Sequence, residues 1–377
     1  MKGRVILIDM PEERADQAAL LVDGRLEDLL LDPPDGDTTP APDEIYWAKV
    51  DRLVPKMGGA FVKLTPEHRG FLREAKGLRE GDQLPTYVSV FAEPGKAIPV
   101  SRHLLFKSRW LILTPGRPGV NVSRSIRDPQ ERERLSKCVA EPDENCGIIV
   151  RTAARGVEEE MLRKVAKAAT SGMRITPEVG KIFAEHSKRI WGGGAVLSAV
   201  REWTDPTPDE IVYAGDGQPD IEEAAWVFRE YPDLDAVATL FDGPDLFDHY
   251  GVWDEIERLK SPRAELPSGA WMAVEATRAM VTVDVNTGGE FGGGAALTAN
   301  LEAARELPRQ LRLRGLGGQV IIDFAPLPKK DRKRIEAALK AAFRRDPVET
   351  SLAGWTPLGN FELQRKRERR PLSELLA

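Results

Sequence analysis

The sequence has little cysteine, little histidine and no long apolar segment, and each shortage excludes a class of protein. Only two cysteines, Cys138 and Cys146, occur in 377 residues, without a nearby histidine. This is neither a zinc-binding pattern nor a disulfide framework, so we expect two ordinary thiols in a reducing compartment. The four histidines are scattered, which argues against a His-rich metal site. No segment approaches the roughly 18–20 consecutive apolar residues of a membrane span.

The N-terminal apolar run is too short for a signal peptide, so a cytoplasmic location without membrane contact is expected. The composition, 41% hydrophobic and 30% charged, is typical of a globular protein with sizeable cores. A net charge of −6 argues mildly against a nucleic-acid partner. Positive charge nevertheless gathers in Pro328–Asp346 and Leu363–Arg370. Such blocks indicate either phosphate contacts or a solvated helix face.

The order of short segments predicts a mixed α/β chain with several domains. Three short strands open the sequence, the last two joined by an Asp-Gly turn, and a proline-rich acidic loop from Asp32 to Glu44 marks a boundary. Short strands between Ile45 and about Pro115 indicate a small β-barrel. From Val120 to about Arg201 the pattern mixes a strand, "CGIIV", with the helix "VEEEMLRKVAKAATSGM".

The segment "MVTVDVNTGGEFGGG" places a polar pair on an apolar strand. Because side chains alternate along a strand, Val281, Val283 and Val285 face one way, and Asp284 and Asn286 share the other face. A polar pair on a strand that otherwise belongs to a core needs a partner elsewhere in the chain.

A second acid follows one helix later. The helix "ALTANLEAARELPRQLRLRGLGG" contains Pro308, which predicts a kink, and ends at glycine. The strand "QVIIDFAP" then carries Asp323. Strand, helix and strand at this length form a right-handed parallel βαβ unit, whose strand ends meet at one edge of the sheet. Asp284 and Asp323 are therefore expected to be neighbours.

Two carboxylates and an amide oxygen suit a hard divalent cation, in particular Mg²⁺. "DVNTGG" begins like a calcium loop, but its twelfth position is Ala295 and not a glutamate, which excludes an EF-hand. The glycine run lacks the Gly-Lys-Ser/Thr ending of a phosphate loop. The alternative that both acids merely terminate their strands stays open at this point.

Several motifs resemble the RNase E/G family of bacterial endoribonucleases. "VDVNTG", "NLEAARELPRQLRLRGLGGQVIIDF", "LPSG" and "LFDHYG" are similar to its catalytic core. "IYWAKVDRLVPKMGGAFVKL" with "GFL" resembles its S1-type OB-fold, and "IIVRTAARG" resembles its 5′-sensor. The similarity covers nearly the whole chain and is weakest between about residues 157 and 235.

The resemblance implies a domain organisation. An RNase H-like domain would comprise residues 1–35 and 211–278, with an S1-type OB-fold at 36–118 inserted. Residues 119–210 would form the 5′-sensor region, and residues 279–377 the DNase I-like catalytic domain.

The resemblance also implies a role for each site residue. Asp284 and Asp323 would bind Mg²⁺, and Asn286 would orient the attacking water or the phosphate. A 5′-monophosphate would be bound by a second set of residues. These are Arg151, Thr152 and backbone near Gly119 and Val122.

RNA outside the cleavage site would be held by the barrel and by the C-terminal basic segments. Phe61 and Phe71 would stack on bases, and Lys96 would contact backbone phosphate, as aromatic platforms with basic rims do for single strands. A barrel phenylalanine is otherwise more often a core residue. Further candidate phosphate contacts are Lys329, Lys330, Arg365 and Lys366.

Four departures from the family pattern stand out. The zinc-link motif after the catalytic domain has no counterpart, which puts zinc-mediated dimer pairing in doubt and leaves the oligomeric state open. Gly289 stands where arginine is usual, Arg278 where an acid is expected, and Ala325-Pro326 where the family has Ile-Asp. Loss of groups that support metal ligands costs about one or two orders of magnitude in activity.

The acid pair and the family resemblance together predict a Mg²⁺-dependent endoribonuclease specific for single strands, and the resemblance implies a role in ribosomal RNA processing or messenger RNA turnover. Its partner would be single-stranded, A/U-rich RNA, including RNA with a 5′-monophosphate. The alternative is a non-catalytic RNA-binding regulator that keeps the fold and the acids.

Overall fold

The computed structural model of the chain describes residues 2–12, 14–34, 36–139, 145–171, 189–191, 194–215, 231–289 and 294–376. It divides into two units. Unit 1 comprises Met1–Lys2, Ala19–Leu29 and Asp242–Ala377, and unit 2 comprises Gly3–Ala18 and Leu30–Phe241. In the part of the chain that the structure describes, no helix has the length and apolar character needed to span a membrane.

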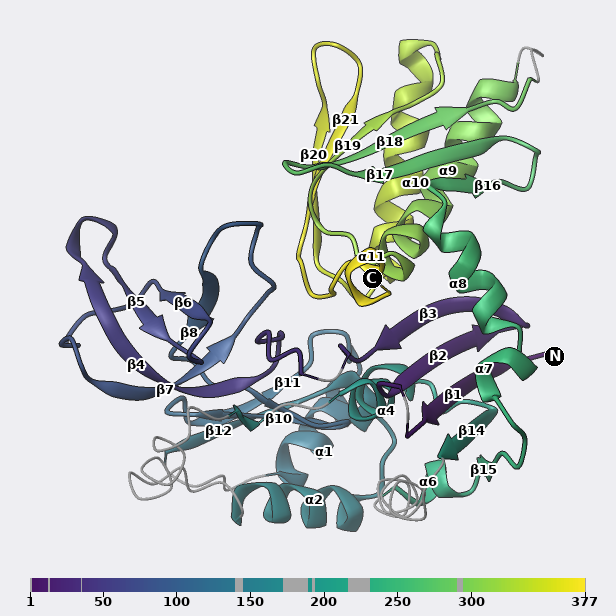
Figure 1. The fold of residues 1–377 in the computed structure, drawn as a ribbon. Coiled ribbons are helices and arrows are strands. Elements are labelled where there is room, and N and C mark those ends of the chain that lie inside the picture. The colour runs from purple at the N-terminus through teal and green to yellow at the C-terminus, as the bar shows by residue number, and fades with distance from the viewer. Residues whose placement is uncertain are drawn as a thin grey trace. The chain divides into compact units, whose positions relative to one another are not determined.

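Unit 2 contains a closed five-stranded barrel (Figure 1), which confirms the barrel predicted from the short strands. Its strands pair in the order β4-β5-β6-β8-β7, and β7 returns to β4 to close it. The strands are β4 (Ile45–Val54), β5 (Gly59–Lys63), β6 (Arg69–Leu72), β7 (Gln83–Val88) and β8 (Ile98–Ser101). The short β13 (Arg189–Trp191) adds to β4. Alternating residues such as Val62 and Leu72 fill the interior.

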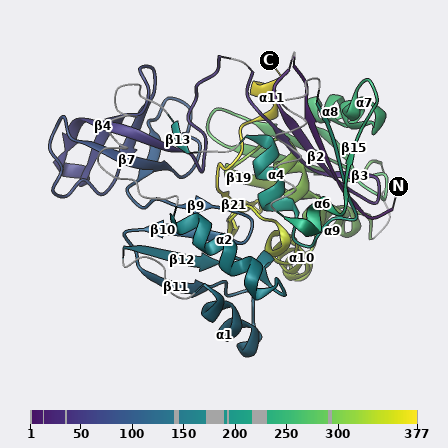
Figure 2. The same cartoon turned by 90° about the horizontal axis from the view of Figure 1, so that it is seen from below.

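A second sheet of unit 2 has the order β11-β12-β10-β9. Its strands are β9 (Phe106–Lys107), β10 (Leu111–Pro115), β11 (Gly119–Val122) and β12 (Cys146–Val150). Helices α1 (Pro129–Cys138) and α2 (Glu159–Ser171) pack against it (Figure 2). The strand at Leu111–Pro115, expected within the barrel, instead pairs with β12 in this sheet, because its apolar side chains belong to the core beneath α1 and α2.

Parallel pairing joins β1 (Arg4–Met10) to β14 (Glu210–Gly215) and β14 to β15 (Ala238–Leu240). Unit 2 also contains the short helices α4 (Ala195–Trp203) and α6 (Pro232–Asp235). The strands β2 (Gln17–Val22) and β3 (Arg25–Leu31) are neighbours joined by Asp23-Gly24, both at positive φ (51° and 77°). Positive φ at both central residues is the geometry of a type I′ hairpin turn, as the Asp-Gly pair predicted.

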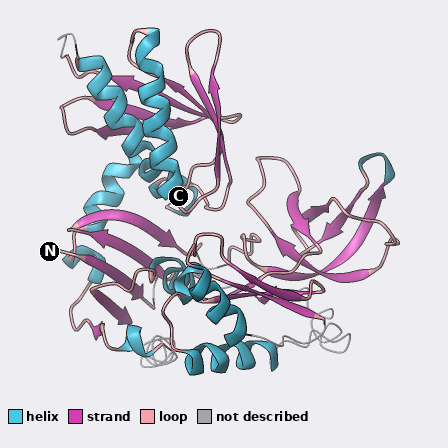
Figure 3. Cartoon of the chain, turned by 180° about the vertical axis from the view of Figure 1, so that it is seen from behind, coloured by secondary structure: helices cyan, strands magenta, loops and turns pink. Residues whose placement is uncertain are grey.

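Unit 1 is built on a six-stranded sheet with one face covered by helices (Figure 3). The strand order is β16-β17-β18-β19-β21-β20. The strands are β16 (Arg263–Glu265), β17 (Trp271–Ala276), β18 (Val281–Asn286), β19 (Gly318–Asp323), β20 (Thr350–Trp355) and β21 (Phe361–Arg365). Helices α9 (Ala295–Leu313) and α10 (Arg332–Arg345) share one core with the sheet. We call the other face of this sheet the open face.

The predicted βαβ unit is confirmed, because β18 and β19 pair in parallel and α9 connects them. Helix α9 runs through Pro308 without interruption. Ala304 and Leu311 of this helix are buried in the core of unit 1. The shorter helices of unit 1 are α7 (Leu246–His249), α8 (Val252–Lys260) and α11 (Leu372–Leu375).

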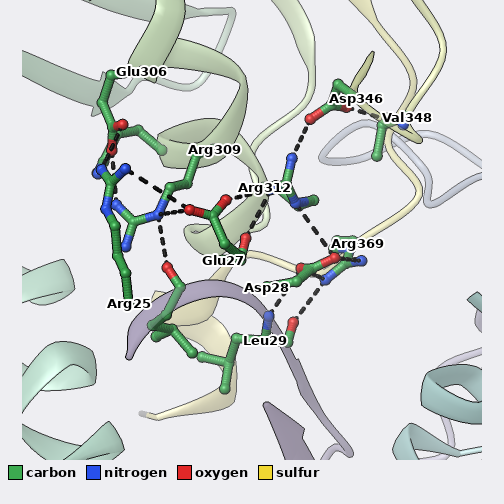
Figure 4. Close-up of polar contacts among 12 residues, drawn as sticks. Arg25, Glu27, Asp28, Leu29, Glu306, Arg309, Arg312, Asp346, Val348 and Arg369 are labelled. Carbon is green, nitrogen blue, oxygen red and sulfur yellow. Dashed lines mark hydrogen bonds and ion pairs between the residues drawn. The ribbon is translucent and has the colours of Figure 1, made fainter. Parts of the chain in front are cut away.

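A network of buried ion pairs lies inside unit 1 (Figure 4). The Arg312 guanidinium pairs with Asp346 and with Asp28, whose Oδ2 lies 3.3 Å from Nε. Asp346 also binds Arg365 at 2.9 Å, and Asp28 accepts two bonds from Arg369, at 2.5 and 2.9 Å. The side chains of Asp28, Asp346 and Arg365 are at most 3% exposed. We call these five residues the core ion network.

Candidate functional site

The two acids predicted to meet do so on the open face. Asp284 and Asp323 are directly opposite each other in the parallel pair β18–β19. Neighbouring strands lie about 4.8 Å apart, so the two carboxylates are close neighbours. Val281, Val283 and Val285 alternate with Asp284 on β18 and point into the core, as the period of two predicted. The apolar side of the strand thus holds the acid pair in place.

Asn286 completes this group, and we call Asp284, Asn286 and Asp323 the acid row. The Asn286 side-chain amide donates to Asp284 Oδ2 at 2.7 Å, which fixes the orientation of that carboxylate. Both aspartates are exposed, and among the described residues neither has a cationic side chain as an ion-pair partner. Within the described ranges no third His, Cys, Asp or Glu joins them. Two adjacent carboxylates without a counter-charge form a site that favours a cation.

The backbone that follows Asp323 is clamped by Asn300 of α9. The Asn300 amide donates to the carbonyl of Ala325 at 2.8 Å, and its carbonyl accepts the Ala325 N–H at 2.9 Å. Asn300 is fully buried, so these bonds are shielded from water. Our sequence reasoning missed this residue. An asparagine on the apolar face of a helix indicates a specific contact, because a buried amide needs hydrogen-bond partners.

A second clamp holds the loop before β17. Glu302 of α9 accepts the N–H and the hydroxyl of Ser268, at 3.1 and 2.7 Å. Gly288, just after the acid row, has φ +67°, and a Cβ there would lie 2.2 Å from the Gly269 carbonyl. Only glycine allows this approach. Helix α9 and the two glycines therefore hold the loops on either side of the acid row.

The departures from the family pattern lie at different distances from the acids. Arg278 is in the exposed turn between β17 and β18, at the end of the hairpin remote from Asn286. The part of β18 from Val281 to Asp284 therefore separates Arg278 from the acids. Gly289 and Pro326 are exposed, and Ala325 is buried in the Asn300 clamp through its backbone alone. A clamp made to backbone atoms does not depend on the side chain at residue 325.

Arg151, a candidate 5′-phosphate ligand, is engaged by other groups of unit 2. Its Nη1 donates to the carbonyls of Ser108 at 2.7 Å and Arg201 at 3.2 Å, and its Nη2 donates to Glu202 at 3.1 Å. Burial raises the pKa of Glu202, but the charges of Arg151 and Arg201 outweigh burial and hold that pKa below its usual value. Glu202 is thus a carboxylate already bound to the predicted phosphate ligand.

The other three 5′-phosphate candidates lie along β11 and the end of β12. Thr152 follows β12, and its hydroxyl lies 3.0 Å from that of Ser123, the residue after Val122. The parallel pairing of β11 with β12 therefore brings Thr152 and Val122 together. Gly119 starts β11, three residues before Val122 and about 10 Å from it along the strand. Thr152 and the Arg151 guanidinium have no hydrogen-bond partner in common within the described residues.

The two predicted stacking residues lie on the outside of the barrel. Phe61 and Phe71 face each other across β5 and β6, with ring centroids 5.2 Å apart at 65°. Both are half-buried and neither belongs to the barrel core, so the core alternative does not hold for them. Lys96 is exposed in the loop before β8 and pairs with Glu93 at 2.5 Å.

Basic residues that we did not single out surround these rings. The Arg52 guanidinium lies 5.2 Å from the Phe61 ring centroid. Lys63 and Arg69 face each other across the same two strands, two pairs along from the phenylalanines and on the same face of the sheet. The spacing "FVK" and "RGF" carried this signal, because residues two apart on a strand share a face.

The C-terminal basic candidates divide into exposed and buried residues. Lys329 and Lys330 are exposed in a short 3₁₀ turn before α10, and exposed Lys366 pairs with Glu349 at 2.5 Å. Arg365 is 1% exposed and belongs to the core ion network. The prediction that Arg365 contacts phosphate is therefore wrong, because its strand position turns it into the core.

The sequence is similar to one family of known proteins. The model of the Ribonuclease E/G family matches residues 106–368. Ribonuclease G of Salmonella typhimurium (strain SL1344) is 34% identical, in an alignment that covers 88% of this chain and 74% of that protein. Ribonuclease G of Escherichia coli (strain K12) is 33% identical with the same coverage. Ribonuclease E of Escherichia coli (strain K12) is 28% identical over 96% of this chain and 37% of that longer protein.

Proposed function

The chain belongs to the Ribonuclease E/G family, and we propose that it is an endoribonuclease that hydrolyses phosphodiester bonds of single-stranded RNA at the acid row. Relatives named Ribonuclease G and Ribonuclease E support the reaction class. The observation that carries the site is the register of Asp284 with Asp323, two exposed carboxylates with no cationic partner among the described residues.

The donor set of the acid row fits a divalent cation, in our proposal Mg²⁺. Mg²⁺ is usually held by one or two carboxylates while water and substrate phosphate complete its shell, so two aspartates are a sufficient set of protein ligands. When bound, such an ion offsets the negative charge that grows on the phosphate and lowers the pKa of water. Asp284 and Asp323 would hold it, and Asn286 keeps Asp284 oriented.

The outer face of β5 and β6 is the proposed track for RNA. Phe61 and Phe71 offer ring surfaces to unpaired bases, and Arg52, Lys63 and Arg69 supply cations for the phosphates beside them. Stacking is sequence-tolerant because every base has a π-face. The track therefore favours single strands without strict sequence reading. We propose A/U-rich single strands as the substrates. Lys329, Lys330 and Lys366 remain proposed phosphate contacts.

A 5′-monophosphate would bind near the end of β12. The Arg151 fork has five N–H donors, and its contacts leave some of them for phosphate. The domain assignment as RNase H-like, S1-type OB-fold, 5′-sensor and DNase I-like regions is part of this proposal. Processing of ribosomal RNA precursors or messenger RNA turnover would be its role.

The test compares cleavage of a short A/U-rich RNA by wild type, Asp284→Asn and Asp323→Asn, with Mg²⁺ and with a chelator. Losing several kcal/mol of charge stabilisation should slow cleavage about a thousandfold in either variant. Glu362→Gln is the matched control, because Glu362 is a carboxylate on the open face, opposite Ile321 and outside the acid row. Its rate should stay near that of wild type.

RNA binding separates the two candidate functions. Binding should persist in Asp284→Asn and Asp323→Asn, because the proposed RNA track lies on the barrel. Tight binding by wild type without Mg²⁺-dependent cleavage would instead identify a non-catalytic RNA-binding regulator. A faster rate on RNA with a 5′-monophosphate than with a 5′-hydroxyl, lost in Arg151→Ala, would support the 5′-end site.

A further inference from the structure

An aromatic residue lies on the open face directly beside the acid row. Trp271 on β17 is opposite Asn286 on β18 in the antiparallel pair. It is half-buried, and it is not part of the hydrophobic core of unit 1. Trp355 of the same sheet behaves differently, because its ring packs against Phe324 and Phe361 on the helix side. The position of Trp271 therefore has no explanation in core packing.

Trp271 carries a stacked guanidinium. The Arg263 guanidinium carbon lies 4.6 Å from the centroid of the Trp271 ring, within the range of a cation–π contact. Glu265 holds Arg263 in this position by accepting its Nε–H at 2.6 Å. The Arg263 side chain is still 50% exposed. The pair is thus preorganised and accessible at once.

The register of four strands sets the distance from this pair to the acids. Arg263, Ala273, Asp284 and Asp323 are successive partners across β16, β17, β18 and β19. Two strand spacings, about 10 Å, separate Arg263 from Asp284. The residue between them is alanine, whose methyl group leaves the surface low. A chain that crosses the acid row can therefore reach the stacked pair.

We propose that the Arg263–Trp271 pair is a nucleotide-binding site for the base next to the phosphate that is cleaved. The inference rests on the proposed function and adds a residue-level subsite to it. The base stacks on the guanidinium plane that faces away from the indole, and the indole holds that plane in position, as unpaired bases stack on arginine and aromatic side chains. The Arg263 charge lies near the adjacent phosphate and offsets part of the negative charge of the acid row.

This subsite acts through stacking and not through hydrogen bonds that read a base. It therefore requires an unpaired base but tolerates all four, and its loss weakens binding at one nucleotide position. Stacking on one aromatic residue changes affinity about 5- to 150-fold when the residue is replaced by alanine. We expect Trp271→Ala to raise KM for short RNAs by a factor in this range. Trp271→Phe keeps a ring and should recover most of the affinity.

The experiment measures RNA binding in the Asp284→Asn background, which does not depend on cleavage. A set of RNAs, each with one abasic nucleotide, is titrated against Asp284→Asn and against Asp284→Asn/Trp271→Ala. Asp284→Asn should lose affinity at one abasic position next to the cleavage site. Asp284→Asn/Trp271→Ala should bind that RNA and the unmodified RNA equally, because the indole that holds the stacking plane is already gone.

Glu275→Gln is the matched control, because Glu275 lies on the same strand and the same face, four residues from Trp271. Circular dichroism of each variant checks that it is folded. If Trp271→Ala loses affinity equally for every abasic RNA, Trp271 has no defined subsite and the inference is wrong. If Asp284→Asn binds no RNA, the proposed function itself fails, which is a separate outcome.

Discussion

The acid row and the core ion network lie on opposite faces of the same sheet, and their carboxylates differ in burial and in ion-pair partners. Asp284 and Asp323 are exposed, adjacent and without a cationic partner among the described residues. Asp28 and Asp346 are buried, and each binds two guanidinium groups. Among the described residues, negative charge is therefore unpaired in the acid row, whereas arginines balance the negative charge within the core ion network.

The difference separates charges that stabilise the fold from charges that are available to a ligand. A buried carboxylate costs folding free energy unless cations and hydrogen bonds compensate it, and the core ion network supplies both. Two adjacent uncompensated carboxylates repel each other, and that cost is recovered when a cation binds. The same residue type therefore has a structural role on one face and a ligand-binding role on the other.

The largest effect should come from the core ion network. Asp346→Asn leaves Arg365 buried without its counter-charge, so the free energy of unfolding should fall by about 3–5 kcal/mol. Urea unfolding followed by circular dichroism measures this. Glu349→Gln removes the partner of exposed Lys366 and should change stability by less than about 0.5 kcal/mol. Equal effects of the two substitutions would show that the buried ion pair stabilises the fold no more than the exposed one.

The next effect concerns a bound cation. Mg²⁺ at ten times its dissociation constant should stabilise the wild type by about 1.4 kcal/mol, because it binds only the folded state. Thermal unfolding with Mg²⁺ and with a chelator measures this gain. Asp323→Asn should lose the gain, whereas Glu362→Gln should keep it. A gain that survives in Asp323→Asn would place the cation elsewhere.

A smaller effect of opposite sign is expected without metal. Like charges directly opposite on neighbouring strands destabilise a sheet by about 0.2–1 kcal/mol. In the presence of a chelator, Asp323→Asn should therefore unfold at a higher urea concentration than wild type, even though it does not cleave RNA. A lower midpoint for this variant would show that the acid pair supports the fold.

The smallest effect tests an intermediate case, a carboxylate paired near the surface. Glu131 accepts two hydrogen bonds from Arg134, at 2.7 and 2.8 Å, which lower its pKa to about 2 despite the opposing effect of burial. A folded-state pKa below the unfolded value stabilises at higher pH. The contribution, about 0.5 kcal/mol or less, is present above about pH 4.5 and is lost as the pH falls through about 2.

Urea unfolding of wild type and Glu131→Gln at neutral and acid pH measures this contribution. The two midpoints should differ at pH 7 and converge as Glu131 becomes protonated. A difference that grows toward low pH would contradict the sign of the pKa change.

The acid row could be predicted from the sequence because two periodic rules determine it. Alternation places Asp284 opposite the valines, and the parallel βαβ connection brings the end of the next strand alongside. The same alternation contained the correct answer for Arg365, which shares a face of β21 with Phe361 and Leu363. We missed this burial because a run of basic residues suggested a solvent-exposed face. The position of its partner Asp346 depends on how the chain returns to the sheet after α10.

The remaining site features depend on contacts that no local pattern contains. The pairing of Arg263 with Trp271 follows from the β16–β17 register, and the Asn300 clamp depends on how α9 packs over the end of β19. Glu202 reaches Arg151 from a helix about 50 residues further along the chain. Such partners are chosen by tertiary packing, and a single sequence gives no rule for them.

Unit 1 is assembled from distant parts of the chain, which has a consequence for protein synthesis. Asp28 is made early by the ribosome, and Arg369, which binds it, follows 341 positions later. Domains generally fold as units while the chain grows. The hairpin that carries Asp28 therefore cannot form its final contacts early in synthesis. The core ion network is complete only after Arg369 has left the ribosome. A truncated chain that lacks Arg369 still carries Asp284 and Asp323. It cannot complete the core ion network on the other face of the sheet that carries these two acids.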